Sequence, residues 1–181
     1  LERALDFLTV ENYDFFLGQF FIGEDHWTCI AAEAAFDAGV DKPEYARFCY
    51  AFAELNARAQ YQVDDGPVAD LHGAFGITPW FMPHNTPAGS RTEANVASYL
   101  LSVKRKEPQP QILRSVRMSL RYLIDQQIRP ESAYLFPRPE LAVGGMMQTP
   151  VRGNIRIDFV QHAAAAMARA IELVPVESWR P

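Results

Sequence analysis

The stretch that most constrains the fold is a glycine-rich turn that runs directly into a helix near the end of the chain. The turn covers residues 144–150 and reads Gly-Gly-Met-Met-Gln-Thr-Pro. Residues 154–162 follow it and read Asn-Ile-Arg-Ile-Asp-Phe-Val-Gln-His, before a run of alanines. A helix that lies wholly in a core gains nothing from charged and polar first turns. We therefore expect this helix to direct its N-terminal end at a cavity.

The length and composition indicate one globular domain. The chain has 181 residues, of which 49% are hydrophobic and 22% are charged, as in an ordinary soluble protein. A net charge of -5 and the lack of a basic block argue against nucleic acid as a partner and against a polybasic membrane contact. No apolar run approaches the roughly 20 residues that a membrane span requires.

The start of the chain leaves its compartment open. No charged and then apolar leader precedes the first element, which slightly favours a cytoplasmic location. The chain begins at Leu1 rather than Met, however, so an absent leader is weak evidence. We expect a processed or excised piece, such as the C-terminal portion of a larger protein.

Hydrophobic periodicity and end signals predict an all-α fold. The expected helices cover residues 1–8, 26–38, 41–62, 91–106, 111–128 and 155–173. Gly39 should end the second helix, Pro43 should lie in the first turn of the third, and Ser90 should cap the fourth. Segments rich in glycine, proline and aromatic residues separate the helices. Cys29 and Cys49 are too few for a disulfide framework, and we expect buried free thiols on neighbouring helices.

A shift of about 65 residues aligns several features of these helices, which indicates a repeated helical hairpin. The aligned positions are His26 with Arg91 and Arg156, Thr28 with Glu93 and Asp158, and Pro43 with Pro108. A few matching columns can arise by chance. These aligned residues lie at expected helix starts, however, where hairpins of the same geometry would need similar residues.

The two helices of each repeat have different faces. The second helix carries bulkier or charged residues. The first carries small ones, which are Ala31, Ala32, Ala34 and Ala35, then Ala94, Ala97 and Ser98, and then Ala163 to Ala166. Small faces allow helices to approach closely on both sides, as in an inner ring, whereas bulky faces suit an outer ring. Two concentric rings of alternating helices form an α/α toroid. Its loops gather at one end, around the mouth of a central cavity.

The segments 144–146 and 155–162 resemble the glycine-rich loop and inner helix of α/α-toroid enzymes. These include terpenoid cyclases and protein prenyltransferases, and six-hairpin glycosidases and sugar epimerases share the ring architecture. The resemblance covers residues 89–173 well and residues 20–39 loosely. It implies a fold, and leaves the reaction open because one fold hosts many chemistries.

The chain also departs from these families. The repeated Gln-Trp motifs of triterpene cyclases and the Asp-rich cyclisation motif are absent. A full toroid needs roughly six hairpins, and this chain holds about two and a half, so the expected fold is a partial toroid. Because unpaired ring ends would expose apolar faces, we expect the chain to self-associate or to require a missing partner segment.

Charged side chains at the expected cavity mouth favour an enzyme that acts on a glycan or sugar. Glu93 and Asp158 could share acid and base roles at a glycosidic bond, and His162 or His26 could transfer a proton at a sugar carbon. The candidates for substrate binding are Arg91, Arg156, Gln161, Trp27, Trp80 and Phe81, the aromatic ones by stacking on sugar rings. The alternative is that each carboxylate pairs with the arginine two residues earlier or caps its own helix.

Two other functions stay open. The first is an isoprenoid-binding site of the terpenoid cyclase or prenyltransferase type. The only set that could hold zinc in such a site is Asp25, Cys29 and His162. Prenyltransferases place the Cys about one repeat before the His, whereas here it lies two repeats away, so we expect no cofactor and keep zinc as the alternative. The second is a non-catalytic binding or structural module.

Overall fold

The computed structural model describes residues 1–14, 26–62, 69–78 and 81–173. Within these residues the chain is mostly helical and has one two-stranded sheet, which confirms the all-α expectation in its main part. The helices are α1 (Glu2–Asp6), α3 (Trp27–Asp37), α4 (Pro43–Ala59), α5 (Asn85–Lys104), α6 (Pro110–Gln126), α7 (Pro139–Ala142) and α8 (Ile157–Leu173). The strands are β1 (Met147–Thr149) and β2 (Arg152–Ile155), and a π-helical turn, Phe7–Glu11, continues α1.

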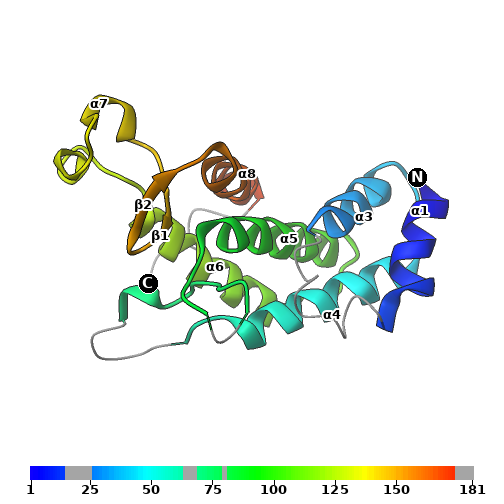
Figure 1. Cartoon of the computed structure of the whole chain (residues 1–181). Coiled ribbons are helices and arrows are strands. Elements are labelled where there is room, and N and C mark those ends of the chain that lie inside the picture. Colours follow the sequence, from blue (N-terminus) through cyan, green and yellow to red (C-terminus); the bar gives the residue numbers. More distant parts are fainter. Residues whose placement is uncertain (15–25, 63–68, 79–80, 174–181) are drawn as a thin grey trace.

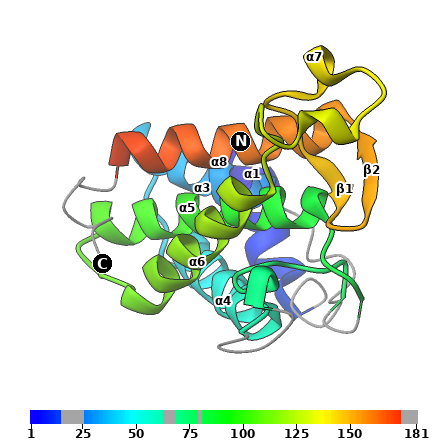
Figure 2. The same ribbon diagram turned by 90° about the vertical axis from the view of Figure 1, so that its left-hand side faces the viewer.

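Helix α5 is the centre of the molecule (Figure 1). Almost every side chain from Asn85 to Ser102 is buried, because α5 packs against α3, α4, α6 and α8. The helices with small faces form one layer, α3–α5–α8, in which α5 is the middle helix. Helices α4 and α6 pack against the other side of α5 (Figure 2). The division into small-faced and bulky helices therefore corresponds to two layers.

Small residues bring the helices of the first layer close together. Ala32, Ala94 and Ala97 lie in the core between α3 and α5, and Ala88 and Ala163 lie between α5 and α8. Gly89 lies at a point where α8 approaches α5 closely. A Cβ atom added at Gly89 would lie 2.7 Å from the Cβ of His162 and 2.9 Å from the backbone nitrogen of Ala163.

A partly buried ion-pair network around Glu33 ties the same three helices together at the other end of the layer. Glu33 of α3 accepts from Lys104 of α5 and from Arg169 of α8. Lys104 also donates to Asp37 at 2.7 Å. Burial acts to lower the pKa of Lys104, but the hydrogen bonds to Asp37 and Glu33 outweigh it, so the pKa lies above its ordinary value.

Several predicted helix ends are confirmed. Gly39 follows the end of α3 with a left-handed φ of 85°, and Pro43 is the first residue of α4. Cys29 and Cys49 are buried free thiols on these two neighbouring helices. Among the described residues, no helix has the length and apolar character that crossing a membrane demands.

The predicted start of α5 is wrong. The helix begins at Asn85 instead of Arg91, and the His84 side chain caps it by accepting from the backbone N–H of Thr86 at 3.2 Å. Pro87 is compatible with this start because the first turn has no helical partner for its missing N–H. Ser90 consequently lies inside the helix and is not its cap.

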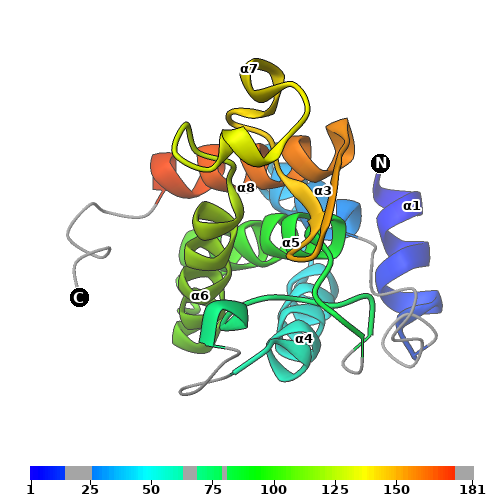
Figure 3. The same ribbon diagram turned by 60° about the vertical axis from the view of Figure 1, so that its left-hand side comes forward.

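The start of α6 also breaks the predicted alignment, whereas the start of α8 agrees with it. Helix α6 begins at Pro110, so Pro108 is not equivalent to Pro43. Helix α8 begins directly after Arg156, as α3 begins directly after His26, so the alignment of these two residues is confirmed. Residues 147–155, before α8, form the β1–β2 hairpin, which pairs Met147 with Ile155. The hairpin lies beside α5 (Figure 3), where the Asn85 side chain donates to the carbonyl of Met147 at 2.7 Å.

Candidate functional site

Three buried polar side chains from three different parts of the chain meet beside α5. His26 immediately precedes α3, Glu93 belongs to α5, and His162 belongs to α8. The Nδ1 of His162 lies 3.0 Å from the Oε2 of Glu93, and the Nε2 of His26 lies 3.8 Å from the same oxygen. The exposed fraction is only 6% for His26, 6% for Glu93 and 8% for His162.

The position of α5 explains why Glu93 joins the two histidines. Helix α5 contacts both α3 and α8, so one of its side chains can reach both. Gly89 lies one turn before Glu93 on the same face of the helix. Because Gly89 lets the backbone of α8 approach, the ring of His162 reaches the level of the Glu93 carboxylate.

The chemistry of the cluster follows from its burial. A buried carboxylate is costly unless it is paired, and an imidazole N–H is a suitable partner. When Nδ1 of His162 carries the hydrogen, it donates to Glu93 and leaves Nε2 with a lone pair. A carboxylate that fixes the tautomer of a histidine in this way is a common arrangement in sites of proton transfer and in metal sites.

An exposed aromatic ring lies next to the cluster. Trp27 keeps 61% of its exposure, and its ring centroid lies 4.4 Å from that of His26 and 6.4 Å from that of His162. The two histidine rings meet edge to face, with centroids 4.7 Å apart. A flat apolar surface therefore borders the three polar side chains, as a ring-shaped ligand would require.

Asp158 does not belong to this cluster. Its carboxylate accepts from Arg156 at 2.9 Å and from the hydroxyl of Thr86 at 3.0 Å. This is the pairing with the arginine two residues earlier that the sequence left open as an alternative. The carboxylate of Glu93, in contrast, faces His162 and His26.

The other predicted binding residues are dispersed. Arg91 is buried and donates to the backbone carbonyls of Gly76 and Ile77, at 2.6 Å and 3.1 Å, so it anchors the segment before α5. Gln161 is exposed on α8, beside His162. Phe81 is also exposed. Trp80 lies outside the described residues.

The zinc set considered from the sequence is only partly described. Asp25 lies outside the described residues, and Cys29 is packed in the core among residues that include Ala32 and Ala94. Among the described residues, the group that brings three potential metal ligands within 4.8 Å of one another is His26, Glu93 and His162.

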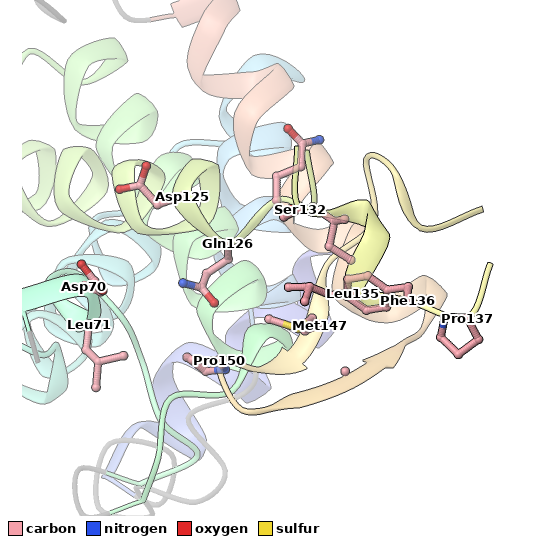
Figure 4. A pocket seen from close by; sticks show the side chains of 13 residues that line it. Asp70, Leu71, Asp125, Gln126, Ser132, Leu135, Phe136, Pro137, Met147 and Pro150 are labelled. Atoms are coloured by element: carbon pink, nitrogen blue, oxygen red, sulfur yellow. The ribbon is translucent and has the colours of Figure 1, made fainter. Parts of the chain in front are cut away.

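A separate cavity of about 530 Å³ lies near the hairpin (Figure 4). It is open to solvent and lies between the end of α6, residues 132–137 and the hairpin, and its lining includes Leu71, Phe136 and Met147 together with Asp70 and Asp125. None of the three clustered residues lines it. None of its lining residues was a candidate for catalysis or binding from the sequence, although Met147 and Pro150 belong to the glycine-rich turn.

No protein-family model, curated protein or solved structure matches the chain.

Proposed function

We propose that the chain is an enzyme, or part of one, that acts on a glycan or another sugar as a hydrolase, lyase or epimerase. The reactive centre is the cluster of His26, Glu93 and His162. The observation that carries the proposal is the buried contact of 3.0 Å between His162 and Glu93, beside the exposed ring of Trp27. A carboxylate and two imidazoles supply acid and base groups, and Trp27 supplies a surface for a sugar ring.

The roles of the side chains follow from this geometry. Glu93 accepts the Nδ1 hydrogen of His162, so Nε2 is the atom that takes a proton from the substrate or from water. The negative charge of Glu93 then stabilises the imidazolium that forms. His26, whose ring is 4.7 Å from that of His162, is the second group that can return or donate a proton.

The polar character of the cluster favours a sugar over an isoprenoid. An isoprenoid chain would need a pocket of mainly apolar side chains, whereas the reactive groups here are a carboxylate and two imidazoles. The cavity near the hairpin is more apolar, but it also contains Asp70 and Asp125 and does not include the clustered residues.

Trp27 provides the first test. We expect Trp27→Ala to raise KM by about tenfold and to change kcat less, because a stacking platform binds substrate without taking part in proton transfer. The measurement is a product assay by chromatography on a panel of neutral and uronate-containing oligosaccharides. Tyr134→Ala, which removes another exposed aromatic ring, should leave KM unchanged. If no glycan is bound or turned over, while an isoprenoid diphosphate binds, the sugar proposal fails.

We further propose that the two layers are an arc of an α/α toroid that additional hairpins complete. The exposed residues of the small-faced layer support this. Ala34 of α3 and Ala164 and Ala168 of α8 are exposed, and Ile157 and Ile171 of α8 keep 76% and 75% of their exposure. Apolar faces of this kind are normally covered.

The toroid proposal predicts that the isolated chain self-associates. Covering the apolar faces of α3 and α8 removes them from water, so the mass from light scattering should rise with protein concentration. Ile171→Glu should shift the distribution toward the monomer because it places a charge on the face to be covered. A monomer at every concentration would argue against completion of the ring by second copies.

A further inference from the structure

We propose that His26, Glu93 and His162 bind a divalent transition-metal ion of the zinc class. This set differs from the Asp25, Cys29 and His162 set considered from the sequence. It combines two imidazoles with one carboxylate, which are ligand types that zinc accepts in proteins. The proposal does not rest on the sugar reaction, because metal binding can be measured without any substrate.

The separations of the ligand atoms suit such an ion. In a tetrahedral site with bonds of about 2.0–2.1 Å, neighbouring ligand atoms lie about 3.4 Å apart. The carboxylate oxygen of Glu93 lies 3.0 Å from Nδ1 of His162 and 3.8 Å from Nε2 of His26, on either side of that value. All three ligand atoms lie within 4.8 Å of one another. The widest of these separations, up to 4.8 Å, exceeds the tetrahedral value by about 1.4 Å, so the imidazole rings must rotate toward each other to surround one ion.

The environment of the cluster also suits a metal ion. The three ligands come from three segments whose positions are fixed by packing on α5, so little order has to be created on binding. The carboxylate offsets part of the charge of the ion at a buried position, where an uncompensated charge would be costly. Three protein ligands leave a fourth position of a tetrahedral site for water or substrate.

His162 cannot bind the metal ion through Nδ1 and act as the proposed general base at the same time. An ion bound at Nδ1 displaces the hydrogen that pairs with Glu93, and the neutral ring then carries its hydrogen on Nε2. His162 with zinc bound therefore cannot accept a proton from a substrate. If the sugar reaction proceeds as proposed above, zinc should inhibit it, and the binding measurement is independent of that result.

The test is a titration of the chelator-treated chain with zinc chloride by calorimetry, and with cobalt chloride by visible absorption. We expect one equivalent of zinc with a Kd of about 1 μM or below, and the intense visible bands of four-coordinate cobalt. Glu93→Gln and His162→Gln should each weaken zinc binding at least about tenfold, since each removes a ligand. Their helical circular dichroism is recorded first.

His72→Gln is the matched control, because it removes another of the four histidines of the chain. It should bind zinc with unchanged affinity. Absence of saturable zinc binding by the unaltered chain would overturn the proposal, whether or not the variants fold. Equal weakening by His72→Gln and His162→Gln would also overturn it, because it would indicate adventitious binding to histidines at large.

Discussion

Replacing Glu93 by glutamine is expected to lower kcat by a factor of about one hundred or more on any sugar that the chain turns over. The amide keeps the size of the side chain and removes its charge. His162 Nδ1 then loses the charged acceptor that lies at 3.0 Å, and the imidazolium formed during the reaction is no longer stabilised. The measurement is kcat and KM of Glu93→Gln with helical circular dichroism as the check on folding.

Two further substitutions make this result specific. Glu172→Gln also removes a carboxylate, at an exposed position of α8, and should leave kcat unchanged. Asp158→Asn should reduce kcat by less than about tenfold, because Asp158 is paired with Arg156 and Thr86 instead of the histidines. Retained activity in a folded Glu93→Gln variant would remove Glu93 from the mechanism.

Gly89→Val is expected to lower the free energy of unfolding by about 3 kcal/mol. The added Cβ would lie 2.7 Å from the Cβ of His162 and 2.9 Å from a backbone nitrogen of α8. Neither of these atoms is the end of a flexible side chain, so the two helices must move apart. The measurement is urea denaturation followed by circular dichroism.

The control for helix propensity is Ala164→Val, which places a valine at an exposed position of α8. At a protein concentration at which the chain is monomeric, it should lower the free energy of unfolding by less than about 1 kcal/mol, since only the intrinsic preference of the helix is then affected. Because separation of α5 and α8 would also move His162 away from Glu93, Gly89→Val should weaken zinc binding in any fraction that remains folded. Equal stability of Gly89→Val and Ala164→Val would contradict a close helix contact at this point.

The sequence predicted a helix end correctly where that end depends on the residues at that position. Gly39 and Pro43 were predicted correctly because a left-handed φ and a fixed φ are properties of single residues. The start of α5 was not predicted correctly, because Pro87 and Gly89 are also typical of loops. Only the packing of α8 shows that Gly89 serves a helix contact.

For the candidate site, the sequence likewise indicated single residues but not which of them meet. His26, Glu93 and His162 were each singled out from the sequence, but the alignment at a fixed spacing put Glu93 together with Asp158 and Thr28. That alignment assumed equal distances from each residue to the start of its helix. Thr28 and Asp158 are each the second residue of their helices, but the earlier start of α5 makes Glu93 its ninth residue. Which residues meet depends on the order of helices in the layer, which no local pattern encodes.

Nitrogen-15 NMR of the histidine side chains tests the central claim most directly, with each signal assigned by substitution. The account predicts that neutral His162 is held as the Nδ1–H tautomer and that its signals change in Glu93→Gln, while those of His72 do not. A His162 ring that averages between both tautomers, or that is insensitive to Glu93→Gln, would contradict the cluster on which the proposed functions depend.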